Sequence, residues 1–109
     1  MFVRADQFME MLRCLTDQDA RKRELGADKV TDWVGSYSRE DGRMLVGVLS
    51  ILAACERDHG ALEAQLNALL ELGAGGHSDL QSLAHLREID LEVLPDSLGG
   101  YVNDLLETT

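Results

Sequence analysis

Residues 44–55 form a run that is apolar on nearly every side of a helix, interrupted only by Gly47 and Ser50. Charged residues stand directly before and after this run. A helix that is apolar all round has to be wrapped by other elements, whereas crossing a bilayer takes about 20 apolar residues. The run is too short for a membrane span, so it predicts a central core helix over residues 39–57.

Composition and periodicity place the rest of the chain in the all-α class. A chain of 109 residues has the length of one domain and can bury a core without disulfide or metal staples. One proline, 5% aromatic residues and abundant leucine and alanine favour helices over a β-sandwich. We expect a single domain over residues 1–109, a compact bundle of about six short helices around the helix at 39–57. The other helical segments are predicted at residues 3–15, 61–72, 78–88 and 96–106. One more is predicted between the first and the central helix, from a cap at Thr16 through Tyr37.

Capping residues and glycines indicate where these helices begin and end. Thr16 and Ser38 are expected to cap the second and third helices, and Asp58 the fourth. Gly26 either breaks or weakens the second helix. The glycines at 73–76 are expected to end the fourth helix.

The last third of the chain has two features that bear on topology. Ser78 and Asp79 are expected to start the fifth segment, and the acid–apolar alternation at 88–93 has the period of a strand. Because no second strand pattern exists, we expect a helix end and a connector there. The pairs 39–57/61–72 and 78–88/96–106 each have the form of a helical hairpin, as in HEAT-like stacks, but two units are too few to define a repeat.

Charge is the property that points most directly to a function. The net charge is −10, and it is unevenly spread. Residues 1–57 hold ten acids and nine bases, whereas residues 58–109 hold ten acids and a single base, Arg87. Such a field repels nucleic acid and anionic membranes and steers basic partners inward. The alternative is that the acidity only keeps a small protein soluble.

The cysteines and the first residues of the chain indicate a cytoplasmic protein. Cys14 and Cys55 lie in apolar helical patterns, where buried free thiols are common, and they pair only if the first and third helices touch there. Asp6 and Glu10 stand where a signal peptide would be uniformly apolar. A reducing compartment is therefore expected.

No motif in the sequence supports catalysis, a cofactor or a metal. The nucleophile elbow, the phosphate-binding loop and the dinucleotide fingerprint are all missing. Cys55 and His59 are four residues apart, but no further zinc ligand lies at a diagnostic spacing. His77 and His85 are expected at a helix end and on an exposed face. We therefore predict a protein that is not an enzyme and that has no cofactor or metal.

Carrier and nucleic-acid functions have weaker support. Asp96-Ser97-Leu98 resembles the phosphopantetheine attachment motif of acyl carrier proteins, but only 11 residues follow Leu98, whereas two helices follow the motif in that family. A helix-turn-helix can be drawn across residues 17–37, yet the acids there neutralise its bases. A chain with a pI near 4.5 lacks the basic surface of a DNA-binding protein.

Recognition of a basic protein remains as the best-supported function. The C-terminal third combines acids with Tyr101 as the only nearby aromatic residue. Charges on such a face set the association rate, while a few buried anchors carry the affinity. The expected partner-binding residues are Glu88, Asp90, Glu92, Asp96, Tyr101, Asp104 and Glu107.

A short, strongly acidic, helical chain without catalytic motifs resembles the immunity proteins of bacterial polymorphic and contact-dependent toxin systems. About half of the chain shares their general character, in the segments Ala61-Leu62-Glu63, Leu69-Leu70-Glu71-Leu72, His77-Ser78-Asp79-Leu80, Leu94-Pro95 and Tyr101-Val102-Asn103-Asp104-Leu105-Leu106. The resemblance implies a protein that blocks a cognate toxin by covering or distorting its active site. Many such toxins are basic nucleases, which the acids after Arg87 would meet as phosphate mimics.

The main alternative is a structural or regulatory helical module that acts as a homodimer. Trp33, Tyr37 and the apolar run at 44–55 supply more apolar surface than six short helices need for packing against one another. In that case the chain binds a second copy of itself through an apolar helix face.

Overall fold

The computed structural model describes residues 3–77 and 79–107, and within these residues it contains helices and no strand. The α-helices are α1 (Ala5–Leu15), α2 (Ala20–Asp32), α3 (Arg39–Cys55), α4 (His59–Ala74), α5 (Leu80–Leu83) and α6 (Asp96–Glu107). Three short 3₁₀ helices complete the described residues: η1 (Val34–Ser36), η2 (Ala84–Glu88) and η3 (Leu91–Val93). The prediction of an all-α protein with about six helices is confirmed.

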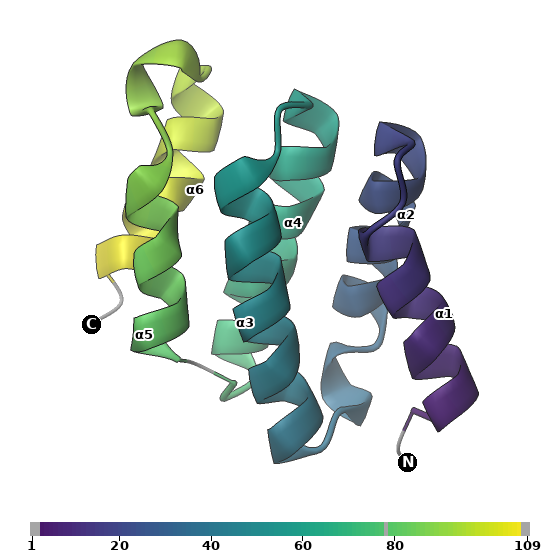
Figure 1. Cartoon of the computed structure of the whole chain (residues 1–109). Helices are drawn as coiled ribbons and strands as arrows, with labels where there is room; N and C mark the ends of the chain where they lie inside the picture. Colours follow the sequence, from purple (N-terminus) through teal and green to yellow (C-terminus); the bar gives the residue numbers. More distant parts are fainter. Residues whose placement is uncertain (1–2, 78, 108–109) are drawn as a thin grey trace.

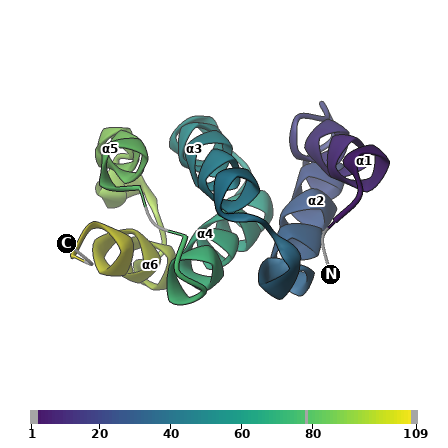
Figure 2. The same cartoon turned by 90° about the horizontal axis from the view of Figure 1, so that it is seen from below.

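The helices form three antiparallel hairpins that stand side by side (Figure 1). The first hairpin is α1 with α2, the second is α3 with α4, and the third is α5 and η2 with α6. Seen from below, α1, α3 and α5 form one layer, and α2, α4 and α6 form the other (Figure 2). The turns within the hairpins therefore lie along one edge, and the connections between hairpins lie along the opposite edge. Two of these hairpins match the predicted pairs, and α1 with α2 adds a third.

The core is centred on α4 rather than on α3. Helix α4 packs against α2, α3 and α6, and its buried side chains include Leu62, Leu66 and Leu72. Helix α3 matches the predicted segment at 39–57, but Met44 and Ile51 are 45% and 52% exposed. The expectation that this helix is wrapped on every side is wrong, because in a stack of hairpins each helix keeps one side toward solvent.

The boundary between α1 and α2 differs from the prediction. Asp19, not Thr16, caps α2, because its carboxylate accepts a hydrogen bond of 2.9 Å from the backbone N–H of Arg21. The Thr16 hydroxyl instead donates to the backbone oxygen of Leu12 at 2.9 Å and closes the last turn of α1. Helix α2 then continues through Gly26 without a break.

The end of α2 also differs, since the helical spacing of Val30, Trp33, Val34 and Tyr37 predicted one continuous helix. Helix α2 ends at Asp32, and η1 folds the chain back so that Tyr37 is buried. Its hydroxyl donates to the backbone oxygen of Val30 at 3.1 Å. Burial, together with the negative charge of Asp32, raises the pKa of Tyr37 to about 12.

The remaining boundaries largely follow the sequence signals. Ser38 caps α3 and Asp58 caps α4, as predicted. Helix α4 runs two residues past the predicted end, and Gly76, with φ +92°, takes the left-handed conformation that favours glycine. The predicted start at Ser78 lies outside the described residues. The alternating stretch at 88–93 forms the end of η2 and then η3, which confirms a helix end and connector.

The two cysteines do not form a disulfide, and only one of them is partly buried. Cys14 is half-buried against the α1–α2 contact, whereas Cys55 is exposed at the end of α3, so the expectation of a buried thiol is wrong for Cys55. Among the described helices, none combines the length and the apolar character that a membrane crossing requires.

Candidate partner-binding site

The predicted partner-binding residues all belong to the third hairpin, but they do not form one cluster. Four of them surround the turn between η2 and α6, which we call the acidic turn (residues 88–96): Glu88, Asp90, Glu92 and Asp96. Asp90 caps η3, because its carboxylate accepts a hydrogen bond of 3.0 Å from the backbone N–H of Glu92. Glu107 lies at the far end of α6, about 16 Å from Asp96 at the rise of an α-helix.

Tyr101 of α6, five residues after Asp96, lines a polar groove on the α2–α4–α6 layer. The groove has a volume of about 360 Å³ and crosses all three helices. Glu24 and Asp28 of α2, Glu63 and Asn67 of α4, and Tyr101 of α6 supply its polar lining. We call this site the acidic groove. Asp104 follows Tyr101 by three residues, which places both on the same side of α6.

The electrostatics of the groove favour a positively charged occupant. Partial burial, with the negative charges of Glu24 and Asp32, raises the pKa of Asp28 above its ordinary value. Ionisation of Asp28 is therefore less favourable than that of a fully solvated aspartate without acidic neighbours. A cation placed in the groove would relieve this repulsion and bring the pKa of Asp28 down.

Sequence reasoning missed Glu24, Asp28 and Glu63, although a signal for two of them is present. Glu24, Asp28 and Asp32 recur at intervals of four residues, so they lie on one face of α2. Like charges at this spacing weaken an isolated helix. Of these three acids, Glu24 forms an ion pair of 2.6 Å with Arg21.

The arginines that form ion pairs within the protein do not pair with the acids of the acidic turn. Arginines at positions 4, 13, 21, 23 and 43 pair with carboxylates at positions 6, 10, 24, 56, 58 and 79. Across residues 3–77 and 79–107, Glu88, Glu92 and Asp96 form no such ion pair. The acids of the second hairpin turn pair with Arg21 and Arg23. The first turn, with Asp17 and Asp19, and the third turn, with Glu88, Glu92 and Asp96, carry acids that form no ion pair among the described residues.

The histidines and cysteines do not come together in a metal centre. No three residues of the types His, Cys, Asp and Glu gather closely enough to hold a metal ion in the part of the chain that the structure describes. His59 is exposed in the first turn of α4, and His85 is exposed on η2. His77 packs against α3, as described below.

Comparisons with known proteins do not assign the chain to a family. No protein-family model matches it, and neither the curated proteins nor the solved structures give a significant match. The resemblance to immunity proteins stays a prediction. Evidence about function therefore comes from the charge, shape and residues of the acidic groove and the acidic turn.

Proposed function

We propose that this protein is a cytoplasmic inhibitor that binds a basic protein, of the kind represented by immunity proteins that neutralise basic toxins. The acidic groove is the observation that carries this proposal. It gathers carboxylates from α2 and α4 next to an aromatic ring from α6, and the net charge of −10 surrounds it with a negative field.

A lysine or arginine side chain of the partner suits the groove in both charge and size. Its cationic group can pair with Asp28 and Glu63 while its aliphatic part covers Tyr101. Both carboxylates are exposed, so the cationic group of a partner can reach them directly. The groove is thus the expected anchor of the interface.

The acidic turn has a different expected role. Glu88 and Glu92 are exposed and carry no internal ion pair among the described residues. Charges that stay exposed at the rim of a complex accelerate association and make it sensitive to salt, whereas charge pairs that become buried on binding control dissociation. Because the groove gathers polar side chains from three helices around one position, a partner side chain seated in it becomes buried on binding. The groove is therefore expected to slow release of the partner and the turn to speed its capture.

The test combines affinity capture from a lysate of the source organism with paired variants. Asp28→Asn with Glu63→Gln removes two charges from the groove, and Glu40→Gln with Glu71→Gln removes two from exposed sites outside it. Asp28→Asn is expected to fold well because it ends a charge repulsion. We expect a basic protein to be captured by the wild type and the control and to elute as salt rises.

For the purified partner, the groove variant is expected to bind about ten- to a hundredfold more weakly than the control, mainly through faster dissociation. Glu88→Gln with Glu92→Gln is expected to lower the association rate and its salt dependence. Equal affinity of the groove variant and its control, or affinity independent of salt, would contradict the proposal. Inhibition itself is read out by whether co-expression with the chain relieves the growth arrest that the partner causes.

A second candidate function is self-association, which one feature of α3 favours. Met44, Val48, Ile51 and Cys55 are spaced by four, three and four residues and form a stripe along the helix. We call it the apolar stripe. Met44 and Ile51 are about half exposed, and this spacing is that of a seam between two packed helices. A second copy of the chain that packs its own α3 on the stripe would cover it.

Ile51→Glu is expected to abolish such a dimer, because it places a charge in the middle of the stripe. Val93→Glu is the matched control, since Val93 is an exposed apolar residue of η3 outside the stripe. Sedimentation equilibrium over a wide concentration range measures both variants against the wild type. A wild type that stays monomeric at the highest concentration rules this candidate out.

A further inference from the structure

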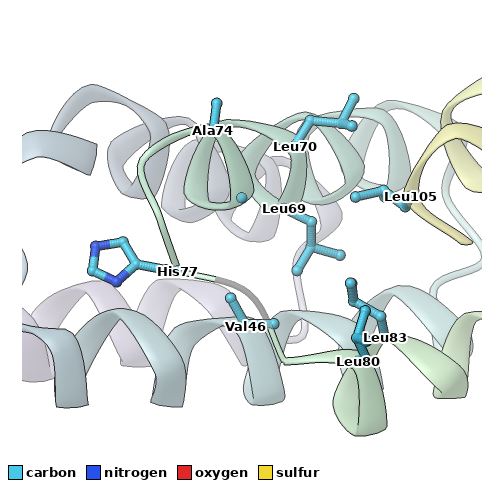
Figure 3. A pocket seen from close by; sticks show the side chains of 9 residues that line it. Val46, Leu69, Leu70, Ala74, His77, Leu80, Leu83 and Leu105 are labelled. Carbon is cyan, nitrogen blue, oxygen red and sulfur yellow. The ribbon is translucent and has the colours of Figure 1, made fainter. Parts of the chain in front are cut away.

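An apolar pocket lies between the second and third hairpins and shares no lining residue with the acidic groove. Its volume is about 390 Å³. The side chains that enclose it come from four helices: Val46 of α3, Leu69 of α4, Leu80 and Leu83 of α5, and Leu105 of α6. In Figure 3 these side chains point toward one common space between α4 and the pair α3 and α5.

His77 stands at one end of the pocket and is held there by two contacts. Figure 3 shows its ring turned away from the leucines. The ring lies directly on the backbone of α3, since a Cβ atom on Gly42 would overlap it. The backbone N–H of His77 donates to the backbone oxygen of Leu72 at 2.8 Å, which ties the segment to the end of α4. The pocket therefore has a fixed end, and its leucine-lined part presents hydrocarbon.

The size of the pocket is that of a ligand site rather than of a packing defect. Ligand pockets in proteins commonly measure about 300 to 1,000 Å³. An apolar cavity of about 150 Å³ is already large enough to bind benzene. The pocket is open on one side, so its apolar lining stays in contact with water unless a ligand covers it, and covering apolar surface is favourable. We propose that this pocket binds a small, uncharged, mainly hydrocarbon molecule.

The charge of the protein sets the chemistry of this ligand. Among the described residues that line the pocket there is no lysine or arginine, and the net charge of −10 repels anions. A cation would lose its hydration among leucines without gaining a carboxylate partner there. A ligand that has an aliphatic or aromatic body, and one neutral polar group at the mouth of the pocket, fits both conditions. The volume also exceeds what one side chain of a protein partner would fill.

The probe for this proposal is decanol, with decanoate as its charged counterpart. Both are titrated into the full chain, and the ¹³C-labelled methyl groups of leucine and valine are followed by NMR. With decanol we expect saturable shifts at Leu69, Leu80, Leu83 and Leu105, and none at Leu15 in the core of the first hairpin. Decanoate is expected to bind at least about tenfold more weakly.

A matched pair of variants distinguishes the pocket from other apolar surfaces. Gly73 lines the pocket, Gly100 lies on α6 outside it, and a Cβ atom at either position meets nothing within 4 Å. Both Gly73→Leu and Gly100→Leu are therefore expected to fold, which circular dichroism checks. We expect Gly73→Leu to weaken decanol binding by about tenfold or more, because the new side chain occupies the pocket, and Gly100→Leu to leave it unchanged.

Two results would overturn the proposal. One is the absence of saturable shifts at the four leucines with decanol at its solubility limit. The other is equal binding by Gly73→Leu and the wild type, which would place decanol outside the pocket. Neither result bears on the acidic groove, so the two proposals fail or stand independently.

Discussion

Glu56→Ala is expected to lower the free energy of unfolding by about 3 to 5 kcal/mol, the largest loss for a single side chain outside the apolar core. Glu56 follows α3, and its side chain is 3% exposed. Its carboxylate accepts hydrogen bonds from Arg23 Nε at 2.7 Å and Nη2 at 2.8 Å, and from Gln65 Nε2 at 2.9 Å. One carboxylate thus joins α2, α3 and α4.

The loss is large because the partners of Glu56 stay behind without it. Arg23 is 21% exposed and Gln65 is buried, so neither regains full hydration when the carboxylate is removed. Leaving a buried polar group without its partner lowers the free energy of unfolding by much more than the intact pair contributes to it. Urea unfolding measures the effect. Glu10→Ala is the control, because Glu10 and Arg13 form an ion pair in which both side chains are exposed, worth about 0 to 1 kcal/mol.

The pH dependence of stability gives a second measurement of the same group. Burial alone would raise the pKa of Glu56, but hydrogen bonds from Arg23, the Asp58 backbone and Gln65 outweigh it and hold the pKa below its ordinary value. The stabilisation from ionised Glu56 is therefore fully present above its unfolded-state pKa of about 4.3. It is lost as the pH falls from that value through the lower pKa of the folded state. The stability difference between wild type and Glu56→Gln should shrink below about pH 4. A difference that is constant from pH 7 to pH 3 would contradict this role.

Gly26→Ala is expected to lower the free energy of unfolding by about 1 to 3 kcal/mol, although it replaces glycine in the middle of a helix. Helix propensity alone predicts the opposite sign, a gain of about 1 kcal/mol. A Cβ atom at Gly26 would lie 2.9 Å from Cys14 Cβ and 2.9 Å from the backbone nitrogen of Leu15. Relief of this overlap requires α1 and α2 to move apart, because a backbone atom cannot rotate away.

Gly73→Ala is the matched control for this prediction. Gly73 is also inside a helix, but a Cβ atom there meets nothing within 4 Å. The control is expected to raise the free energy of unfolding by about 0.5 to 1 kcal/mol through helix propensity alone. If both substitutions stabilise the protein in urea unfolding, the close approach of α1 and α2 at Gly26 is not a constraint.

The sequence by itself determined the features that depend on neighbouring residues along the chain. Ser38 and Asp58 cap the helices that follow them because a side-chain oxygen next to free backbone N–H groups is a local arrangement. The spacing of apolar residues likewise indicated most of the helices and two of the hairpins. It failed at Tyr37, where burial in the core required the chain to leave the helix.

The tertiary structure decided which side chains from different helices meet. Glu24, Asp28 and Glu63 join Tyr101 only because α2 packs beside α4 and α4 beside α6. The predicted acids at 88–96 share one turn, yet Glu107 lies at the far end of α6 from them. The pattern of one helix shows which face is apolar, but not which helix will cover it. That choice rests on packing across the whole stack, and the acidic groove and the apolar pocket both follow from it.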